Sequence, residues 1–299
     1  MVKMVKMVEM VNCLMEDMKR IMIILLAAFV LFDANATHRA LVIGIGDYPV
    51  GSGWAKINGD KDIPMVEDIL RSNGFKKQNI TCLSNSQATC SAICRQLENL
   101  VSAAQTGDYI YIHFSGHGQQ ITDLNGDEDD GLDEAWIPYD AQFAFEKGKY
   151  EGENHLVDDK LNGYLHRLRQ KVGDTGKIVV IADACHSGGG SRGDDEYVIR
   201  GARDAFVIPA TADDRHNADI PVQKVEWVFL SACKPYQSNY EYNGNGSLTY
   251  ALYQQRDNFT RLTAKQIRQS VSQCIASIIP YTQNPVLDVS SGGENNIFF

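Results

Sequence analysis

The 299-residue sequence is poor in several features that would mark a specialised class of protein. Its seven cysteines are too few to hold the fold together by disulfide bonds. Its 25 glycines and 8 prolines form neither a collagen repeat nor a flexible linker. Basic residues are outnumbered, because 28 Lys and Arg stand against 38 Asp and Glu, for a net charge of −10. This balance argues against nucleic acid as the main partner and favours basic substrates or divalent cations.

The N-terminal apolar run is too short to span a bilayer. Ile21–Phe32 would reach about 18 Å as a helix, against roughly 30 Å of hydrocarbon. Two basic residues precede the run and Ala-Asn-Ala follows it, which is typical of a secretory signal peptide. We expect residues 1–36 to be a signal peptide with an N-terminal extension, and residues 37–299 to form one domain. The protein would then be exported, to a periplasm or outside the cell, with no stable membrane insertion. The alternative is an uncleaved membrane anchor.

Short apolar segments alternate with segments of helical periodicity along the rest of the chain. The expected strands are Arg39–Gly46, Asn79–Leu83, Asp108–Phe114, Lys177–Ala182, Val225–Leu230 and Pro285–Val289. The expected helices are Asp60–Ser72, Thr89–Ala104, Asp158–Gln170, Ser247–Gln255 and Ala264–Ala276. A long polar stretch separates the third strand from the third helix. The alternation predicts an α/β fold with a mainly parallel six-stranded sheet and helices on both faces.

A histidine and a cysteine follow two of these strands. His117 lies between two glycines after the third strand, and Cys185 lies just past the fourth. The carboxyl ends of neighbouring parallel strands share one edge of a sheet, where active sites form. An imidazole beside a thiol can generate the thiolate and later protonate a leaving amine. The main-chain amides of Cys185 and Gly118 are candidates to bind the oxyanion. The structural alternatives are a packed core cysteine and a hydrogen-bonded loop histidine.

The two segments that carry these residues resemble a known family. Tyr111–Gln120 (YIHFSGHGQQ) and Ile181–Gly190 (IADACHSGGG) are similar to the catalytic blocks of the metacaspases, caspase-like cysteine peptidases, of the type I or bacterial kind. The resemblance extends over essentially the whole chain beyond the signal peptide. It implies a caspase-haemoglobinase fold, a cysteine endopeptidase with His117 as general acid and base and Cys185 as nucleophile, and a monomer.

The same resemblance implies a pocket for a basic side chain, because metacaspases cleave polypeptides after Arg or Lys. Asp62, Ser115 and Asp183 match the pocket positions of the family. Partly desolvated carboxylates stabilise a guanidinium through charge-assisted hydrogen bonds. Gly59 departs from the family pattern, since many relatives have a cysteine there. The alternative role for Asp62 is that of an acidic residue favoured at a helix N-terminus.

An acidic segment raises the question of a metal. Asp123–Glu134 fits several EF-hand ligand positions, but Glu128 occupies the position that requires glycine, which excludes an EF-hand. The resemblance implies a different site, because many metacaspases are activated by Ca²⁺ through scattered aspartates. Asp133, Asp158 and Asp159 resemble those ligands, and Asp194 is a less certain fourth. The alternative is a solvated acidic loop.

Basic residues in flexible segments are candidate self-cleavage sites. They are Lys147, Lys149, Arg192, Arg200 and Arg203, and we expect processing in the segment after Cys185. Three other functions remain open at this point: a clostripain- or gingipain-like Arg/Lys peptidase, a non-catalytic binding module with a caspase fold, and a secreted calcium-binding structural protein. The short spacing of 68 residues between His117 and Cys185 disfavours the first. The last leaves the Gly-His-Gly and Asp-Ala-Cys-His-Ser-Gly segments unexplained.

Overall fold

The computed structural model describes Met15 and residues 36–128, 130–186, 197–209, 226–290 and 293–298. The chain divides into two compact units, residues 1–37 and 38–299, and the second is described by itself below. The expected signal peptide therefore lies outside the described residues, except for Met15 and Ala36. Among the described residues, no helix combines the length and the apolar character that crossing a bilayer requires.

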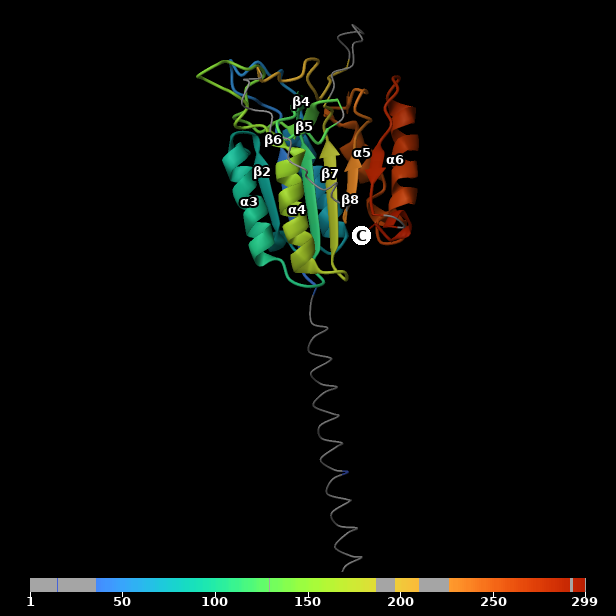
Figure 1. Cartoon of the computed structure of the whole chain (residues 1–299). Coiled ribbons are helices and arrows are strands. Elements are labelled where there is room, and N and C mark those ends of the chain that lie inside the picture. The colour runs from blue at the N-terminus through green and yellow to red at the C-terminus, as the bar shows by residue number, and fades with distance from the viewer. Residues whose placement is uncertain are drawn as a thin grey trace, which may run out of the picture. The chain divides into compact units, whose positions relative to one another are not determined.

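A six-stranded sheet forms the centre of the second unit (Figure 1). Its strands lie in the order β11, β8, β7, β3, β1, β2. Their bounds are β1 His38–Gly44, β2 Ile80–Ser84, β3 Tyr109–Ser115, β7 Lys177–Asp183, β8 Val228–Ser231 and β11 Val286–Asp288. The pairs are parallel except for β11, which runs antiparallel to β8. The prediction of a mainly parallel six-stranded sheet is confirmed.

Helices cover both faces of this sheet (Figure 1). One face packs against α3 (Cys90–Ala103) and α4 (Asp158–Val172), and the other against α2 (Ile63–Ser72), α5 (Ser247–Gln254) and α6 (Ala264–Ile278). The helical periodicity explains the burial, since α4 turns Leu161, Leu165 and Leu168 towards the core. Because both faces are covered, every residue of β3 is buried. The predicted helices are present, although α2 begins at Ile63 after a single 3₁₀ turn, Gly59–Asp62.

The polar stretch after β3 contains structure that the sequence did not predict. It forms a small antiparallel sheet of β4 (Gly118–Thr122), β5 (Leu132–Trp136) and β6 (Leu156–Val157). A short hairpin, β9 (Glu241–Tyr242) and β10 (Asn245–Gly246), precedes α5. These strands have two to five residues, too few for a clear alternating pattern. Both features adjoin the carboxyl edge of the large sheet, where the candidate active site lies.

Candidate active site

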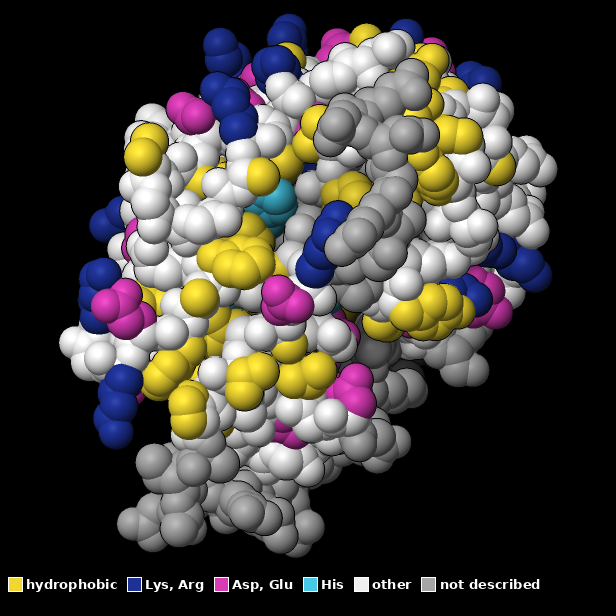
Figure 2. Space-filling model, turned by 90° about the horizontal axis from the view of Figure 1, so that it is seen from above, with side chains coloured by type: hydrophobic (Ala, Val, Ile, Leu, Met, Phe, Trp, Pro, Cys, Tyr) yellow, Lys and Arg dark blue, Asp and Glu magenta, His cyan; other side chains and the backbone are white. Residues whose placement is uncertain are grey.

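The register of β3 and β7 places the expected catalytic residues at one edge. Ser115, the last residue of β3, pairs with Asp183, the last residue of β7. His117 and Cys185 each follow two residues later. Gly118 lies directly against Cys185, because a Cβ atom at Gly118 would be 2.7 Å from the Cys185 carbonyl oxygen. The fold therefore brings the two segments into main-chain contact. Seen from above, this face of the molecule is hollowed, with a histidine side chain in the hollow (Figure 2).

The contacts of His117 fix the orientation and the tautomer of its imidazole. Its Nε2 lies 2.9 Å from the carbonyl oxygen of Ala55, and its ring stacks on Trp54. Because a carbonyl oxygen only accepts hydrogen bonds, Nε2 carries the proton of the neutral ring and Nδ1 carries the lone pair. Nδ1 is buried and has no hydrogen-bond partner among the described residues. Burial lowers the pKa of His117 to about 4, so the ring is neutral at pH 7.

Cys185 is also buried, and its main-chain amide already has a partner. The Cys185 N–H donates to the carbonyl oxygen of Arg200 at 2.9 Å. This amide is one of the two expected to bind an oxyanion, and the chain's own Arg200 carbonyl lies against it. Cys233 lies beside Cys185, and its contact with that residue, together with burial, raises the pKa of the Cys233 thiol well above its usual range.

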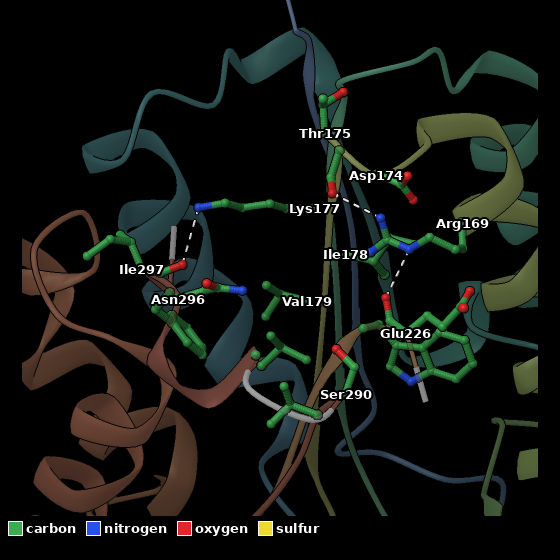
Figure 3. A pocket seen from close by; sticks show the side chains of 16 residues that line it. Arg169, Asp174, Thr175, Lys177, Ile178, Val179, Glu226, Ser290, Asn296 and Ile297 are labelled. Atoms are coloured by element: carbon green, nitrogen blue, oxygen red, sulfur yellow. Dashed lines mark hydrogen bonds between the residues drawn. The ribbon is translucent and has the colours of Figure 1, made fainter. Parts of the chain in front are cut away.

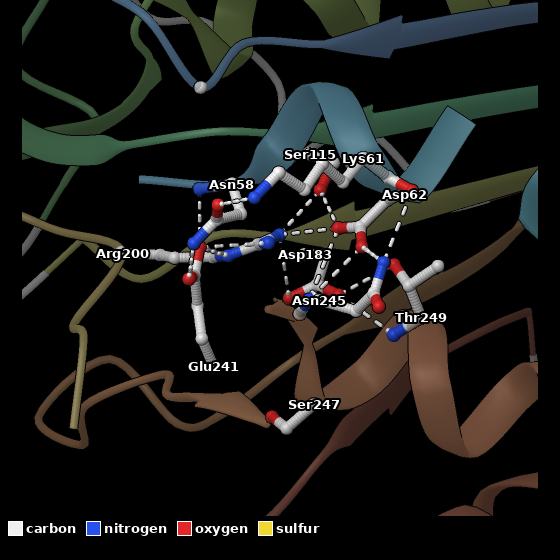
Figure 4. Close-up of polar contacts among 12 residues, drawn as sticks. Asn58, Lys61, Asp62, Ser115, Asp183, Arg200, Glu241, Asn245, Ser247 and Thr249 are labelled. Atoms are coloured by element: carbon white, nitrogen blue, oxygen red, sulfur yellow. Dashed lines mark hydrogen bonds and ion pairs between the residues drawn. The ribbon is translucent and has the colours of Figure 1, made fainter. Parts of the chain in front are cut away.

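The Arg200 side chain extends into an acidic pocket formed by the residues expected to bind substrate (Figure 4). Its Nη1 donates to Asp62 Oδ2 at 2.6 Å and to Ser115 Oγ at 2.5 Å. The same nitrogen lies 3.7 Å from Asp183 Oδ1. Arg200, Asp62 and Asp183 are each 0% exposed. Burial disfavours the charged guanidinium, but the surrounding carboxylates outweigh it and raise the pKa of Arg200 above its usual value.

Neighbouring donors fix the two aspartates of the pocket. Asp183 accepts hydrogen bonds from the Thr249 amide and hydroxyl and from Asn239 Nδ2, at 2.6 to 2.7 Å. Burial raises the pKa of Asp183, whereas Arg200 and these donors lower it. Asp62 directly precedes α2, but its side chain makes no capping hydrogen bond, so the helix-terminus alternative does not describe its contacts. It accepts instead from Arg200 and from the Gly246 amide.

Glu241 and Asn58 belong to the pocket, but no sequence motif or periodicity predicts their place there. Glu241, on β9, lies 3.1 Å from Nε of Arg200, and its carboxylate is held by the side chain and amide of Asn58. Glu241 is about 180 residues from Asp62 along the chain and lies in no recognisable motif. Only the hairpin that precedes α5 brings it to this edge of the sheet.

The main chain around Arg200 is extended and paired on both sides. The Arg200 amide donates to Asn239 O at 3.0 Å, and the Glu241 amide donates to Val198 O at 2.9 Å. Beyond Arg200, the Ala202 amide donates to Gly118 O at 3.1 Å. Gly201 lies so close to Cys185 that a Cβ atom there would collide with Cys185 Sγ. The segment therefore crosses the candidate catalytic residues as an added strand, with the Arg200–Gly201 peptide bond beside the Cys185 sulfur.

One of the aspartates expected to bind calcium, Asp133, lies in a second acidic cluster with Asp123 and Asp127, which were not among the expected ligands. One carboxylate oxygen from each of Asp123, Asp127 and Asp133 lies within 4.8 Å of the others. Burial and the neighbouring aspartates, Asp158 and Asp159 among them, raise the pKa of Asp133 to about 8. Oδ1 of Asp158 is buried without a hydrogen-bond partner in the part of the chain described. An all-oxygen set of mutually repelling carboxylates suits Ca²⁺. The fourth expected ligand, Asp194, lies outside the described residues.

A cavity of about 500 Å³ lies at the opposite edge of the sheet, near the start of β7 (Figure 3). Its basic side chains are already paired. Arg169 donates to main-chain carbonyls, that of Glu226 among them, and Lys177 donates to the carbonyl of Ile297. No cysteine or histidine is among the residues described around it, which separates this cavity from the catalytic edge.

Comparisons with known proteins identify the family. The model of the metacaspase, peptidase C14 domain matches residues 38–191, just over half of the chain. Metacaspase-1 of Emericella nidulans is 35% identical over 160 residues, which cover 50% of this chain and 36% of that protein. Metacaspase-1 of Mycosarcoma maydis is 26% identical over 310 residues, which cover 88% of this chain and 72% of that protein. The chain thus spans about a third of the length of the Emericella relative.

A solved structure supports the fold. A crystal structure of a Geobacter sulfurreducens protein superposes with a TM-score of 0.61 at 21% identity, covering 84% of this chain and 92% of that one. At this identity the likeness concerns the fold alone. The family match rests on the sequence, and it includes both strand ends that carry His117 and Cys185. The chain belongs to the metacaspase family of cysteine peptidases.

Proposed function

We propose that this chain is a cysteine endopeptidase that cleaves polypeptides after arginine or lysine. The observation that carries the proposal is the position of Arg200. Its guanidinium lies among Asp62, Ser115 and Asp183, and its carbonyl oxygen accepts from the Cys185 amide. A basic side chain thus fits the pocket while its peptide bond lies at the nucleophile. The pocket would repel an acidic side chain, because its own charges are negative.

These contacts support the following reaction. His117 Nδ1 takes the proton of the Cys185 thiol, and the resulting thiolate attacks the carbonyl carbon of the basic residue. The Cys185 amide stabilises the negative charge that develops on the carbonyl oxygen. His117 then protonates the leaving amine, the C–N bond breaks, and a thioester remains. Water, deprotonated by His117, hydrolyses this thioester and restores the free thiol.

Three fluorogenic peptides that differ only in the residue before the cut test the proposal. Peptides that end in Arg or Lys are expected to be hydrolysed, and the Asp peptide is not. Cys185→Ala is expected to abolish hydrolysis. Cys274→Ala, which removes a cysteine on α6, serves as the matched control and keeps the rate. Preference for the Asp peptide, or a full rate in Cys185→Ala, would contradict the proposal.

We also propose that calcium stimulates the enzyme through Asp123, Asp127 and Asp133, with Asp158 and Asp159 beside them. When bound, the ion would neutralise these carboxylates and fix the loop between β4 and β5. The raised pKa of Asp133 and the unpartnered oxygen of Asp158 support a cation-binding site at these carboxylates. Calorimetric titration of Cys185→Ala with CaCl₂ should give saturable heat, which Asp133→Asn should abolish. Equal heats from both chains, or equal hydrolysis with and without EDTA, would count against calcium.

Self-processing after Arg200 is part of the proposal. The support is that the Arg200–Gly201 bond already lies beside Cys185 Sγ, whereas Lys147 and Lys149 are exposed on a separate loop. Intact-mass analysis after incubation with calcium should show a cut between residues 200 and 201. Cys185→Ala should stay whole, and Arg200→Gln should lose this cut. Identical fragments from Cys185→Ala would assign the cut to another protease.

The remaining expectations concern location and assembly. We propose that residues 1–36 are removed as a signal peptide and that the enzyme is an exported monomer. N-terminal sequencing of the protein recovered outside the cytoplasm should begin near Thr37. Size-exclusion chromatography with light scattering should give the mass of one chain. An unprocessed N-terminus in the membrane fraction would favour the anchor alternative.

A further inference from the structure

The acidic pocket contacts the two edges of the Arg200 guanidinium with different residues (Figure 4). Asp62 and Ser115 accept from Nη1, at its far end. Glu241 faces the near edge, where its Oε1 accepts from Nε at 3.1 Å and lies 3.0 Å from Nη2. The far contacts require a positive charge at the tip of the side chain. The near contact requires a hydrogen-bond donor one atom before the branch of the guanidinium.

Glu241 is held in place for this contact. The Asn58 amide donates to its Oε1 at 2.6 Å, and Asn58 Nδ2 donates to its Oε2 at 2.5 Å. Its own amide is paired with Val198 O in the strand pairing across the pocket. Glu241 is only 6% exposed, so water does not freely replace a lost partner. The carboxylate is therefore a buried acceptor in a fixed position.

Lysine cannot make the near contact. Along the side chain, the ε-carbon of lysine occupies the place of Nε in arginine, and a methylene donates no hydrogen bond. A lysine ammonium would still interact with Asp62 and Asp183, but the acceptor oxygen of Glu241 would face carbon. A site built around a buried hydrogen bond discriminates strongly against an analogue that lacks the donor.

Charge balance alone does not explain Glu241. Asp62 and Asp183 already provide two carboxylates for one cation, and both are buried. A third buried carboxylate adds electrostatic repulsion to the pocket, so it needs a compensating contact that Asp62 and Asp183 do not make. Its position against Nε is such a contact.

We propose that Glu241 is a specificity-determining residue that makes the pocket select arginine over lysine. The inference rests on the proposed function, because it requires a cut after a basic residue. It narrows the substrate class from Arg or Lys to peptides with arginine before the cut bond. Asn58 is the positioning residue, since it holds the Glu241 carboxylate.

The ratio of kcat/KM for otherwise identical Arg and Lys peptides tests this inference. Every chain carries Arg200→Ala, which empties the pocket and removes differences in self-processing. The unaltered pocket should prefer Arg, and Glu241→Leu should lower the Arg:Lys ratio by about tenfold or more. Asp62→Asn is the matched comparison. It should lower kcat/KM for both the Arg and the Lys peptide and change the Arg:Lys ratio much less. Asp62 contacts the end of the side chain, where arginine and lysine both carry a positive charge.

The possible results distinguish a failure of the role of Glu241 from a failure of the proposed peptidase function. Equal cleavage of Arg and Lys peptides by the unaltered pocket, or an unchanged ratio in Glu241→Leu, would overturn the role of Glu241 while leaving the peptidase intact. No cleavage of either peptide by the self-processed enzyme, with Arg200 and Glu241 both present, would overturn the proposed function itself. If Glu241→Leu does not fold, Asn58→Ala carries the test. It frees the carboxylate and should reduce the ratio in the same direction, and an unchanged ratio there would overturn the inference.

Discussion

The main-chain amide of Cys185 donates a hydrogen bond to the carbonyl oxygen of Arg200, with 2.9 Å between nitrogen and oxygen. Arg200 lies 15 residues after Cys185 along the chain, so this hydrogen bond brings a later part of the chain back to the candidate nucleophile. The neighbouring pairs, Arg200 with Asn239 and Ala202 with Gly118, continue this contact on both sides. An external substrate strand must displace these contacts, because it needs the same main-chain partners and the same pocket.

Gly201→Ala should block self-processing. A Cβ atom at this position would collide with both Cys185 Sγ and the Cys185 carbonyl oxygen, so the Arg200–Gly201 bond would move away from the sulfur. We expect the uncut chain to persist at least tenfold longer by intact-mass analysis, since a displacement near 1 Å can cost about a hundredfold in rate.

A control distinguishes this effect from damage to the active site. Gly148→Ala alters a glycine that has open space around it, although its positive φ adds some strain there. That variant should be processed at the normal rate. Processing of Gly201→Ala at the wild-type rate would mean that the bond is cut in another arrangement.

His117→Ala should lower kcat by about 10² to 10⁴ with little change in KM for an Arg peptide. In the proposed mechanism the imidazole transfers protons, whereas Asp62, Ser115 and Asp183, which contact Arg200 here, bind the side chain before the cut. Steady-state kinetics in Arg200→Ala chains, in which neither variant cuts itself after residue 200, separate the two effects. The control is His166→Gln on α4, whose ring packs on Trp227. A rise in KM with unchanged kcat would reassign His117 to binding.

The strand ends explain why the proximity of the His117 and Cys185 segments could be predicted from the sequence. His117 and Cys185 each follow a buried apolar strand, and Ser115 and Asp183 precede them by the same two residues. Parallel neighbours in register convert these equal offsets into spatial proximity. The periodicity of Leu161, Leu165 and Leu168 likewise suffices to predict α4. Local patterns carry this information because each lies within one element.

The rest of the site depends on contacts between distant segments. Glu241 and Asn58 meet across 183 residues, and neither lies in a periodic pattern or a motif. Asp123 and Asp127 join Asp133 because β4 and β5 pair as a hairpin, whereas a contiguous EF-hand frame fails at Glu128. The contact of Glu241 with Asn58 and the aspartate cluster both depend on the tertiary arrangement of loops at the carboxyl edge of the sheet. A residue count along the chain does not predict them.

Asp183→Asn should weaken both the pocket and the fold. Its carboxylate accepts from the Thr249 amide and hydroxyl and from Asn239, and a carboxamide would turn an NH₂ group towards at least one of these donors. We expect a loss of about 1–3 kcal/mol in the free energy of unfolding and a tenfold or greater fall in kcat/KM for an Arg peptide.

Urea unfolding and peptide kinetics measure the two effects of Asp183→Asn. Asp47→Asn is the control, because the Asp47 side chain is 65% exposed and its ion pair with Lys56 is at the surface. Exposed pairs contribute little, so this variant should match the wild type in both measurements. Wild-type stability in Asp183→Asn would show that the buried network tolerates an amide.

His155 should make the fold sensitive to acid. It is 4% exposed, with Nδ1 at 2.9 Å from the Tyr150 hydroxyl and Nε2 at 3.0 Å from Gln119 Oε1. Burial lowers its pKa from 6.5 to about 4, so the folded state holds the neutral ring while the unfolded chain binds a proton near pH 6.5. The stabilising contribution is therefore complete above pH 6.5 and is lost as the pH falls towards 4.

Between pH 7 and pH 4.5 this single group should remove about 2–3 kcal/mol from the free energy of unfolding. His155→Gln keeps a hydrogen-bonding side chain that does not titrate. Its free energy of unfolding should therefore fall less steeply with acid than that of the wild type. Urea denaturation at half-unit pH steps, carried out in Cys185→Ala chains to prevent self-cleavage, gives both curves. Parallel curves for the two chains would mean that His155 is protonated in the folded protein as readily as in the unfolded one.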